Sequence, residues 1–400
     1  MNRTIERNTY YQKLYPTLNN DDLLEFRIPP NVKANMCLSD VLLRFIIKLP
    51  KVEEENVFVV PENLLGHKQF SSVEIRINGD AVTRRNCSNE YFLSAYFQYL
   101  TNYSTDYVCT SCSSIGMFDT AVLNTDMVTS EAALANTIVR NRKGINDDFV
   151  YEIVMPIDAS IFTSNQNLAT NTPLEISFER AGTSQSTVVT KKIDTSKFPS
   201  VMKLEDVFIL VPYTIDNELQ QAEKMAVSQP IKLKYDEYSI NRFNIPKDSP
   251  NVRLANIMSG PLPEKLFFGI MELESYIGNV ERSSSQFKAY GVKKTTLYID
   301  GNVLSGYPLN IEDNAITIPY VRFQENTNRY MNCYSSRTLT MGDFKNYHFL
   351  YSAALDPTST GTLTFEFDFE TTPDKDLVLI TCGVYDKTIE IDSFRNFKII

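Results

Sequence analysis

The sequence predicts an all-β fold made of two tandem eight-stranded antiparallel jelly rolls with short helices in the loops. Three observations predict this fold: a hairpin motif that occurs twice, short alternating strands in both halves, and a length that suits two cores. The motif reads IRINGDAV at 75–82 and LYIDGNVL at 297–304. Asn78-Gly79 and Asp300-Gly301 favour two-residue hairpin turns, because Asn, Asp and Gly tolerate positive φ. The turn glycines are 301 − 79 = 222 residues apart in a chain of 400, which indicates a duplicated module.

Length and composition agree with two globular domains. A chain of 400 residues exceeds what one hydrophobic core usually serves. The composition, 43% hydrophobic and 22% charged, is typical of globular proteins. No apolar run approaches the roughly 18 to 20 residues that cross a bilayer, and the polar start lacks the apolar centre of a secretory signal. We therefore expect a soluble chain with no transmembrane segment and no export by the secretory route.

Charge and cysteine content exclude two further classes of protein. The formal net charge is −10, and no cluster of Lys and Arg stands out, so specific nucleic-acid binding is not expected. The six cysteines are too few and too scattered for a disulfide framework, which favours a reducing compartment. They are Cys37, Cys87, Cys109, Cys112, Cys333 and Cys382.

The first half reads as strands interrupted by helices, after a polar N-terminal arm at 1–22. Strands are expected at 23–28, 41–49, 149–157, 173–179 and 206–213, and the first hairpin at 73–83. Residues 89–103 carry aromatic side chains at every fourth position, which predicts a helix. This stripe could stack nucleobases, but it lacks interleaved basic residues, so we expect it in the core or in a subunit interface. Within a long excursion at 104–148, a capped segment at 130–142 predicts a second helix.

The second half repeats the same order of signals after a helical connector. Strong helix formers at 216–227, ended by Gln229-Pro230, predict the connector. A strand pair is expected at 232–240 and 265–273, a hairpin at 295–304, a helix at 319–334, and strands at 349–356, 362–370 and 377–391. In 362–370 Leu, Phe, Phe and Phe alternate with polar residues, so one sheet face is buried. The predicted units are the arm 1–22, jelly roll one 23–215, the connector 216–230 and jelly roll two 231–400.

Residues that could carry catalysis or bind a metal are few. His67 and His348 are the two histidines, one in each half, and single histidines are mostly structural or surface residues. Cys109 and Cys112 have CxxC spacing without a second pair or a nearby histidine. Acidic residues at expected turns, where their side chains cap backbone, are Asp80, Asp300, Asp374 and Asp376. Nucleotide, hydrolase and metalloprotease motifs are missing. We expect no enzyme, no catalytic, cofactor-binding or metal residues, and no cofactor.

The final third of the sequence carries a family resemblance. Its segments are SGPLPEKLFFGI (259–270), TTLYIDGNVLSGYPL (295–309), FKNYHFLYSAALDP (344–357), GTLTFEFDFETTPDKDLVLITCGVYDKTIEID (361–392) and SFRN (393–396). This succession resembles the major capsid proteins of Polinton (Maverick) elements and the related adintoviruses over roughly 230–396. The resemblance implies a double jelly roll whose homotrimer forms a pseudo-hexameric capsomer, and a family without a catalytic site.

What the resemblance implies about partners follows from such a capsomer. Capsomers of this kind tile an icosahedral shell around a DNA genome, and the chain is then part of a virion assembled in the cytoplasm or nucleus. Its partners are copies of itself, neighbouring capsomers, and penton or minor capsid proteins. The polar arm is expected to lie at the inner side of the capsid or to reach a neighbour, and 104–148 to form outward loops or the threefold junction.

Alternative interpretations remain open at this point. The chain could be a cellular tandem β-sandwich that binds carbohydrate or protein ligands, although the absence of Trp disfavours a sugar-stacking surface. A β-sandwich hydrolase would need two facing carboxylates at catalytic separation, which the sequence does not identify. A minor capsid protein is a further option, but penton proteins usually need only one sandwich.

Overall fold

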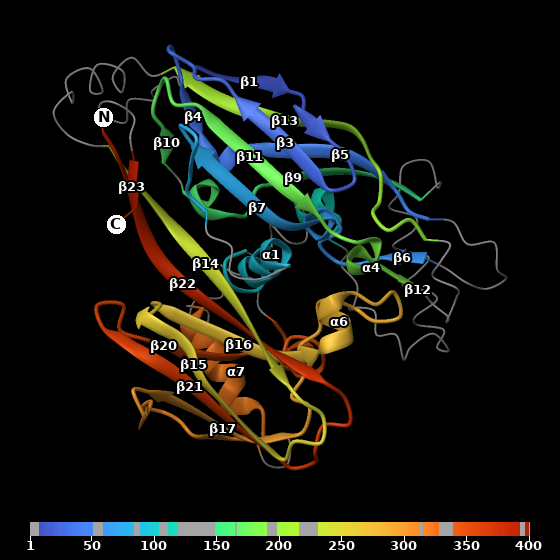
Figure 1. Ribbon diagram of the computed structural model, residues 1–400, viewed down its shortest axis with the longest axis vertical. Helices are drawn as coiled ribbons and strands as arrows, with labels where there is room; N and C mark the ends of the chain where they lie inside the picture. Colours follow the sequence, from blue (N-terminus) through green and yellow to red (C-terminus); the bar gives the residue numbers. More distant parts are fainter. Residues whose placement is uncertain are drawn as a thin grey trace.

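A computed structural model describes most of the chain. The described residues are 8–50, 59–83, 89–103, 111–117, 149–164, 166–189, 198–215, 231–311, 315–327, 339–392 and 397–399. They form two β-sandwiches, one drawn above the other in Figure 1. We call the sheets built from 8–215 the N-terminal sandwich and those built from 231–399 the C-terminal sandwich.

The N-terminal sandwich contains eight principal strands. They are β1 (Asn8–Leu14), β3 (Leu23–Ile28), β5 (Leu42–Lys48), β7 (Phe70–Ile77), β8 (Asp80–Ala81), β9 (Val150–Pro156), β11 (Leu174–Arg180) and β13 (Leu204–Ile215). One sheet pairs the first, last, third and sixth of these strands, and the other pairs the second, seventh, fourth and fifth. Short strands extend these sheets or form a small separate ladder: β2 (Leu18–Asn19), β4 (Asn35–Cys37), β6 (Val59–Pro61), β10 (Asn167–Leu168) and β12 (Thr187–Val189).

The C-terminal sandwich repeats this strand order. Its principal strands are β14 (Ile231–Ile245), β15 (Asn251–Pro261), β16 (Lys265–Glu272), β17 (Val292–Ile299), β18 (Asn302–Val303), β20 (Tyr351–Ala354), β21 (Thr360–Phe369) and β22 (Leu377–Ile391). Again the first, last, third and sixth strands make one sheet and the second, seventh, fourth and fifth make the other. Two short strands, β19 (Leu309–Asn310) and β23 (Phe397–Ile399), pair with β17 and β22. The double jelly roll predicted from the sequence is confirmed.

The twin hairpins have the predicted turn geometry. In the first, φ is 53° at Asn78 and 87° at Gly79; in the second, φ is 48° at Asp300 and 81° at Gly301. Positive φ at both central positions matches the right-handed twist of the flanking strands. The alternation in β21 is also confirmed, because Phe365 and its apolar neighbours in the strand point into the core, where the Phe365 ring lies 4.4 Å from that of Phe268.

Strands β14 and β22 form a long antiparallel ribbon. Each has 15 residues, and they pair in register from Ile231 with Ile391 to Ile245 with Leu377. The ribbon rises out of the C-terminal sandwich alongside the N-terminal one (Figure 1). The predicted strand pair at 232–240 and 265–273 is wrong in one respect: both strands form, but β14 and β16 lie on opposite edges of β22 rather than beside each other.

The helices lie in the connections between strands. They are α1 (Glu90–Thr101), α4 (Thr183–Ser186), α6 (Leu273–Ile277), α7 (Thr317–Asn326) and α8 (Met341–Asn346), with 3₁₀ turns η1 (Leu38–Asp40), η2 (His67–Gln69), η3 (Ser111–Ile115) and η5 (Ser160–Thr163). The helix predicted at 319–334 begins two residues earlier, at Thr317, and ends at Asn326, where the Thr327 hydroxyl bonds to the carbonyls of Phe323 and Gln324. The helices predicted at 130–142 and 216–227 lie outside the described residues. Among those described, no helix is long and apolar enough to span a membrane.

The predicted N-terminal arm at 1–22 needs correction. Residues 8–14 form β1, the first strand of the N-terminal sandwich, and pair with β13 over seven positions. The Tyr10 ring stacks on Tyr213 at 5.6 Å, and its hydroxyl accepts a hydrogen bond from the Asn31 side chain. The segment NTYYQKL has no apolar alternation, so its sequence reads as a free arm. Strand β15 was also missed, because a bulge between Leu254 and Met258 breaks its alternation.

We predict that deleting residues 1–14 destabilises the chain. Removal of β1 exposes an edge of β13 and takes away a ladder whose hydrogen bonds contribute about 0.5–1.5 kcal/mol each, so the free energy of unfolding should fall by about 3 kcal/mol or more. Urea unfolding followed by circular dichroism measures this, since the chain has no Trp. The control Val303→Ser, at a half-exposed side chain in the β18 hairpin of the other sandwich, keeps β1 and should change stability little. Equal stability of the deletion and the full chain would instead support a free arm.

Candidate functional site: the junction between the sandwiches

Helix α1 lies between the two sandwiches and contacts both. Every residue from Tyr91 to Thr101 is buried, as expected for a helix that is covered on all sides. On one side the Tyr91 ring packs against Phe178 of the N-terminal core, 5.8 Å between centroids. On the other side Tyr96 and Phe97 pack against Phe287, at 5.8 and 5.9 Å. The predicted aromatic stripe is thus a core element shared by both halves.

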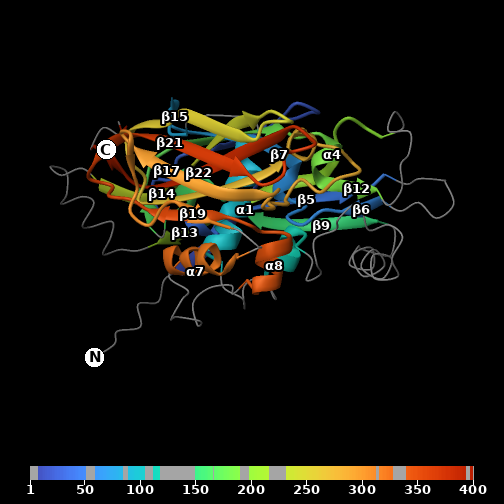
Figure 2. The same ribbon diagram turned by 90° about the horizontal axis from the view of Figure 1, so that it is seen from below.

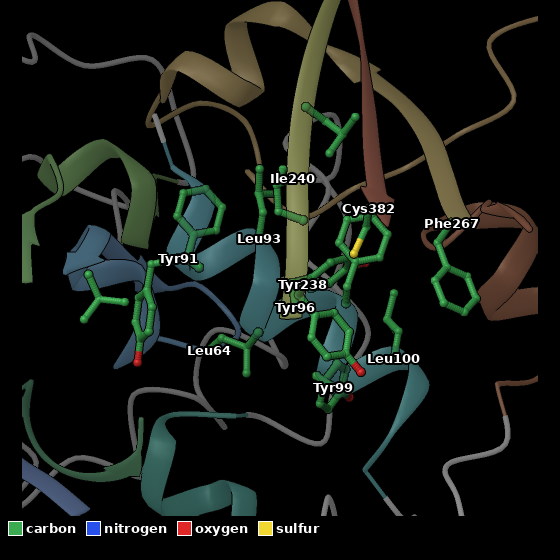
Figure 3. Packing of buried hydrophobic residues seen from close by; sticks show 14 of the residues in the cluster. Leu64, Tyr91, Leu93, Tyr96, Tyr99, Leu100, Tyr238, Ile240, Phe267 and Cys382 are labelled. Carbon is green, nitrogen blue, oxygen red and sulfur yellow. The ribbon is translucent and has the colours of Figure 1, made fainter. Parts of the chain in front are cut away.

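Figure 3 shows how α1 meets the C-terminal sandwich. Leu93, Tyr96 and Leu100 lie towards Ile240 of β14, Cys382 of β22 and Phe267 of β16. These three strand residues form one row across the sheet, because Ile240 pairs with Cys382 and Cys382 pairs with Phe267. The helix therefore covers the face of this sheet that points away from the core of the C-terminal sandwich. We call the corresponding face in either sandwich its outer face.

Polar contacts fix the position of α1 along this face. The Tyr96 hydroxyl donates to the Ser285 carbonyl at 3.1 Å and also bonds to Nδ1 of His348. At the two ends of the helix, the Asn89 amide donates to the Tyr276 carbonyl at 2.9 Å, and the Asn102 amide donates to the Tyr238 hydroxyl at 2.6 Å. Because each bond is directional, the helix cannot slide along the sheet without breaking all of them.

A buried ion pair also joins the two sandwiches. Lys68 Nζ lies 3.0 Å from Glu62 Oε2, and the two residues are only 0% and 2% exposed. The C-terminal sandwich completes the cluster: Lys68 donates to the Ser285 hydroxyl at 2.6 Å, and the Ser283 hydroxyl donates to Glu62 at 3.0 Å. A buried charge pair depends on partners for its remaining polar atoms, and the C-terminal sandwich supplies them to Lys68 and to Oε2 of Glu62, so the cluster favours this arrangement of the halves. Oε1 of Glu62 is buried without a hydrogen-bond partner among the described residues.

A second buried polar group surrounds His67. Its Nδ1 lies 3.1 Å from the Tyr91 hydroxyl, and its Nε2 lies 3.4 Å from Oδ2 of Asp158, which accepts a 2.5 Å bond from Tyr103. Burial lowers the pKa of His67 to about 3. Burial raises the pKa of Asp158 to about 7, opposed by the bond from Tyr103. The two groups therefore favour their neutral forms. Tyr91 and Tyr103 hold them by hydrogen bonds, whereas His67 Nε2 has no hydrogen-bond partner among the described residues.

The other candidate residues are not brought together. The two histidines do not share a site. His67 bonds to Tyr91 of α1, and His348, which is buried beside the same helix, bonds to Tyr96. Asp300 and Asp376 accept backbone N–H bonds from Thr362 and Lys247, at 2.8 and 3.0 Å, as expected for turn residues. The remaining candidates either are exposed at turns or fall outside what is described: Asp80 and Asp374 are exposed, the Cys112 side chain is not described, and Cys109 lies outside the described residues. Within the described part of the chain, no group of three His, Cys, Asp or Glu residues could hold a metal.

A cleft of about 550 Å³ opens where the two sandwiches meet beside α4 and α6. Its walls combine small polar residues with four apolar side chains, Phe198, Pro199, Ile277 and Val280. The residues that line it are Thr183, Ser184, Phe198, Pro199, Ser200, Glu274, Ile277, Gly278, Asn279 and Val280. It holds one carboxylate, so it lacks the facing acid pair that a glycoside hydrolase requires.

Sequence reasoning found α1 but missed the ion pair. Glu62 and Lys68 stand in an unremarkable stretch, and Ser283 and Ser285 belong to a serine run that reads as a surface loop. Charged residues are almost never fully buried unless paired. The hydrogen bond between Lys68 and Ser285 joins residues 217 positions apart, so the burial of this pair leaves no local pattern in the sequence. The arrangement joins two duplicated sandwiches side by side.

These features define the chain as a double jelly-roll protein, with one order of strands occurring twice and a shared buried helix between the copies. Solved structures share this fold. The chain is similar to a chain of the Sputnik virophage structure, with a TM-score of 0.65, 11% identity, and coverage of 98% of this chain and 88% of that one. It is similar to the mavirus major capsid protein, with TM-score 0.56, 11% identity and coverage of 98% and 90%. It is similar to the Faustovirus major capsid protein, with TM-score 0.54, 9% identity and coverage of 96% and 90%.

A sequence relative is found in an animal. An uncharacterized protein of Caenorhabditis elegans is 21% identical over 371 residues, which covers 88% of this chain and 84% of that protein. A comparison with known protein families finds no match. At these identities the solved structures establish a shared fold.

We predict that the buried ion pair responds asymmetrically to substitution. Lys68→Ala leaves the Glu62 carboxylate buried without its cation and should lower the free energy of unfolding by about 3–5 kcal/mol. The double variant Glu62→Leu with Lys68→Met removes both charges and should recover most of that loss. Urea unfolding of both variants measures the difference. An equally severe loss in both would mean that packing volume, and not the unpaired charge, dominates.

The Asp158 cluster predicts a pH dependence of stability. Because the folded-state pKa is raised to about 7, the stability from this group is fully present below its unfolded pKa of 3.8 and is lost as pH rises through about 7. Asp158→Asn keeps an acceptor for Tyr103 and should lose less stability than the native chain between pH 4 and pH 8. The control Asp356→Asn should have a profile parallel to that of the native chain between pH 4 and pH 8, because bonds from Thr358 lower the pKa of Asp356 below 3.8 and its contribution to stability is lost only at lower pH. Parallel pH profiles for Asp158→Asn and the native chain would contradict this assignment.

Proposed function

We propose that this chain is a viral major capsid protein of the Polinton (Maverick) and adintovirus lineage, which forms homotrimeric, pseudo-hexameric capsomers. The observation that carries the proposal is the identical strand order of the two sandwiches, held side by side by α1. The fold similarity to the mavirus and Faustovirus major capsid proteins supports a capsid role. The motifs of the final third support the lineage.

The duplication explains why a trimer suits this fold. Three copies of a chain with two equivalent sandwiches give a closed cyclic assembly with six corners. Identical six-cornered tiles cover a surface with few gaps, and the rigid junction keeps each corner at a fixed angle to the next. The two jelly rolls are separate modules, with the connector 216–230 between them in the sequence. The N-terminal module begins at β1 rather than at residue 23.

Partners and location follow from this role. The chain binds copies of itself, neighbouring capsomers, and penton or minor capsid proteins, within a virion that forms in the cytoplasm or nucleus of a host cell. The net charge of −10 suits a shell that encloses a DNA genome without binding it along its length. The chain acts as a structural protein, without a cofactor and not as an enzyme.

A cellular binding module is the second candidate, and the 550 Å³ cleft between α4 and α6 is the observation that favours it. A cleft of that size could admit a short glycan or peptide. A protein that binds glycans on an array and never assembles would support this alternative over the capsid role.

We predict that the purified full-length chain forms a stable trimer at micromolar concentration. An obligate interface of this kind buries more than about 2,000 Å² in total, which holds subunits together at such concentrations. Gel filtration with light scattering should give the mass of three chains, and electron microscopy should show tile-shaped particles with a six-cornered outline. A stable monomer under these conditions would sink the capsid proposal.

A further inference from the structure

The N-terminal sandwich covers both the outer face and the free edge of one sheet in the C-terminal sandwich. Helix α1 lies over the row formed by Ile240, Cys382 and Phe267, and Phe323 of α7 completes the cover at Phe267. The edge of β14 is covered by the segment that follows β9: the Thr163 hydroxyl donates to the Asp236 carbonyl at 3.2 Å, and the side chain of Gln166 accepts from the Lys234 N–H at 2.9 Å. An edge strand that would otherwise offer unpaired backbone groups is thus protected within the chain.

Among the described residues, no helix lies over the same sheet in the N-terminal sandwich. Its corresponding row consists of Lys13 in β1, Leu210 in β13 and Leu42 in β5, which pair across the sheet. Lys13 is exposed, and Leu210 and Leu42 are only partly buried. In the described part of the chain, β13 is the one strand that pairs with β1, so the other edge of β1 is open.

The uncovered outer face is rich in aromatic side chains. Tyr11 and Tyr15 are 60% and 62% exposed. The Tyr15 ring meets Phe208 edge-on at 6.3 Å, and Lys13 Nζ lies 3.8 Å from the centroid of Phe208, which places these side chains on one surface. Exposed tyrosines grouped around apolar residues and a cation are typical of a protein interface.

The C-terminal sandwich carries a counterpart of α1, the helix α7, which has one exposed side. Both α1 and α7 follow the fifth principal strand of their sandwich. Whereas α1 is buried on all sides, α7 is buried on one side only, where Phe323 packs against Phe267 at 6.0 Å. Its other side carries Ile318, which is 57% exposed, and the exposed carboxylate of Glu325. Figure 2 shows α7 and α8 lying outside the strand layers on one side of the molecule.

We propose that α7 of one copy docks on the outer face of β1, β13 and β5 in the next copy. This contact repeats between chains the relation that α1 has with β14, β22 and β16 within the chain, and it rests on the trimer proposed above. In this contact the Ile318 side chain packs against the surface formed by Tyr11, Tyr15 and Leu210. The Glu325 carboxylate lies near the ammonium group of Lys13. The occupant is a second copy of this chain, because the internal repeat supplies both halves of the contact.

Such a contact is head-to-tail, since the helix surface and the sheet surface are different patches of one chain. Head-to-tail contacts close into rings when the rotation between copies permits. If each chain-to-chain step repeats the step between its own two sandwiches, and that step is a rotation of about 60°, the ring contains six sandwiches and closes with three chains. The trimer therefore needs no surface beyond these two to determine its number of subunits.

Two complementary variants test this contact in the full-length chain. Variant A, Tyr11→Asp with Tyr15→Asp, damages the sheet surface, and variant B, Ile318→Asp, damages the helix surface. Val303→Asp is the matched control, since Val303 is 48% exposed in the β18 hairpin of the other sheet. We expect A alone and B alone to have the mass of one chain by light scattering, and Val303→Asp to keep that of three. An equimolar mixture of A and B should have the mass of two chains, because one intact pair of surfaces remains.

The outcomes separate this inference from the capsid proposal. Trimers formed by both A and B would overturn the docking of α7 on β1 and leave the trimer itself standing. Monomers in the A and B mixture, with each variant showing the circular dichroism spectrum of the native chain, would overturn the head-to-tail pairing. A native chain that is itself monomeric would remove the capsid proposal and this inference together.

Discussion

The burial of α1 between the two sandwiches is the constraint on which the rest of the structure depends. Most of the helix surface consists of aromatic and leucine side chains, and even its polar side, formed by Ser94, Gln98 and Thr101, is buried, so the helix is stable only when both sandwiches cover it. The hydrogen bonds from Asn89, Tyr96 and Asn102 then fix the C-terminal sandwich relative to the helix. The two halves consequently behave as one body with a defined angle, which is the property that a repeated tile requires.

Much of the fold could be predicted because it follows from local rules. The Asn78-Gly79 and Asp300-Gly301 turns specify hairpins, and the alternation around Phe365 and Phe367 specifies a half-buried strand, without reference to distant residues. Strand β1 could not be found in this way. Its side of the sheet is half open in a single chain, so nothing selects apolar residues at alternate positions, and its place in the sheet is determined by β13, about 200 residues further along.

The candidate site shows the same division. The aromatic stripe of α1 has a helical period that marks it as buried, but its partners, the row containing Cys382 and the Phe287 ring, come from strands and loops far along the chain. The Glu62–Lys68 pair depends on Ser283 and Ser285 arriving from the other sandwich, and hydroxyl groups in a serine run carry no signal of burial. Contacts that exist only after both halves have folded leave no pattern in either half alone.

The ribbon of β14 and β22 gives the molecule a mechanical property. Fifteen paired residues at about 3.4 Å per residue make a beam on the order of 50 Å long that runs past both sandwiches. A force that pulls the ends of this beam apart along its length loads the ladder in shear, so many hydrogen bonds resist together instead of opening one after another. A wall assembled from such beams would resist stretching by a packed interior, and its weakest points would be the seams between chains.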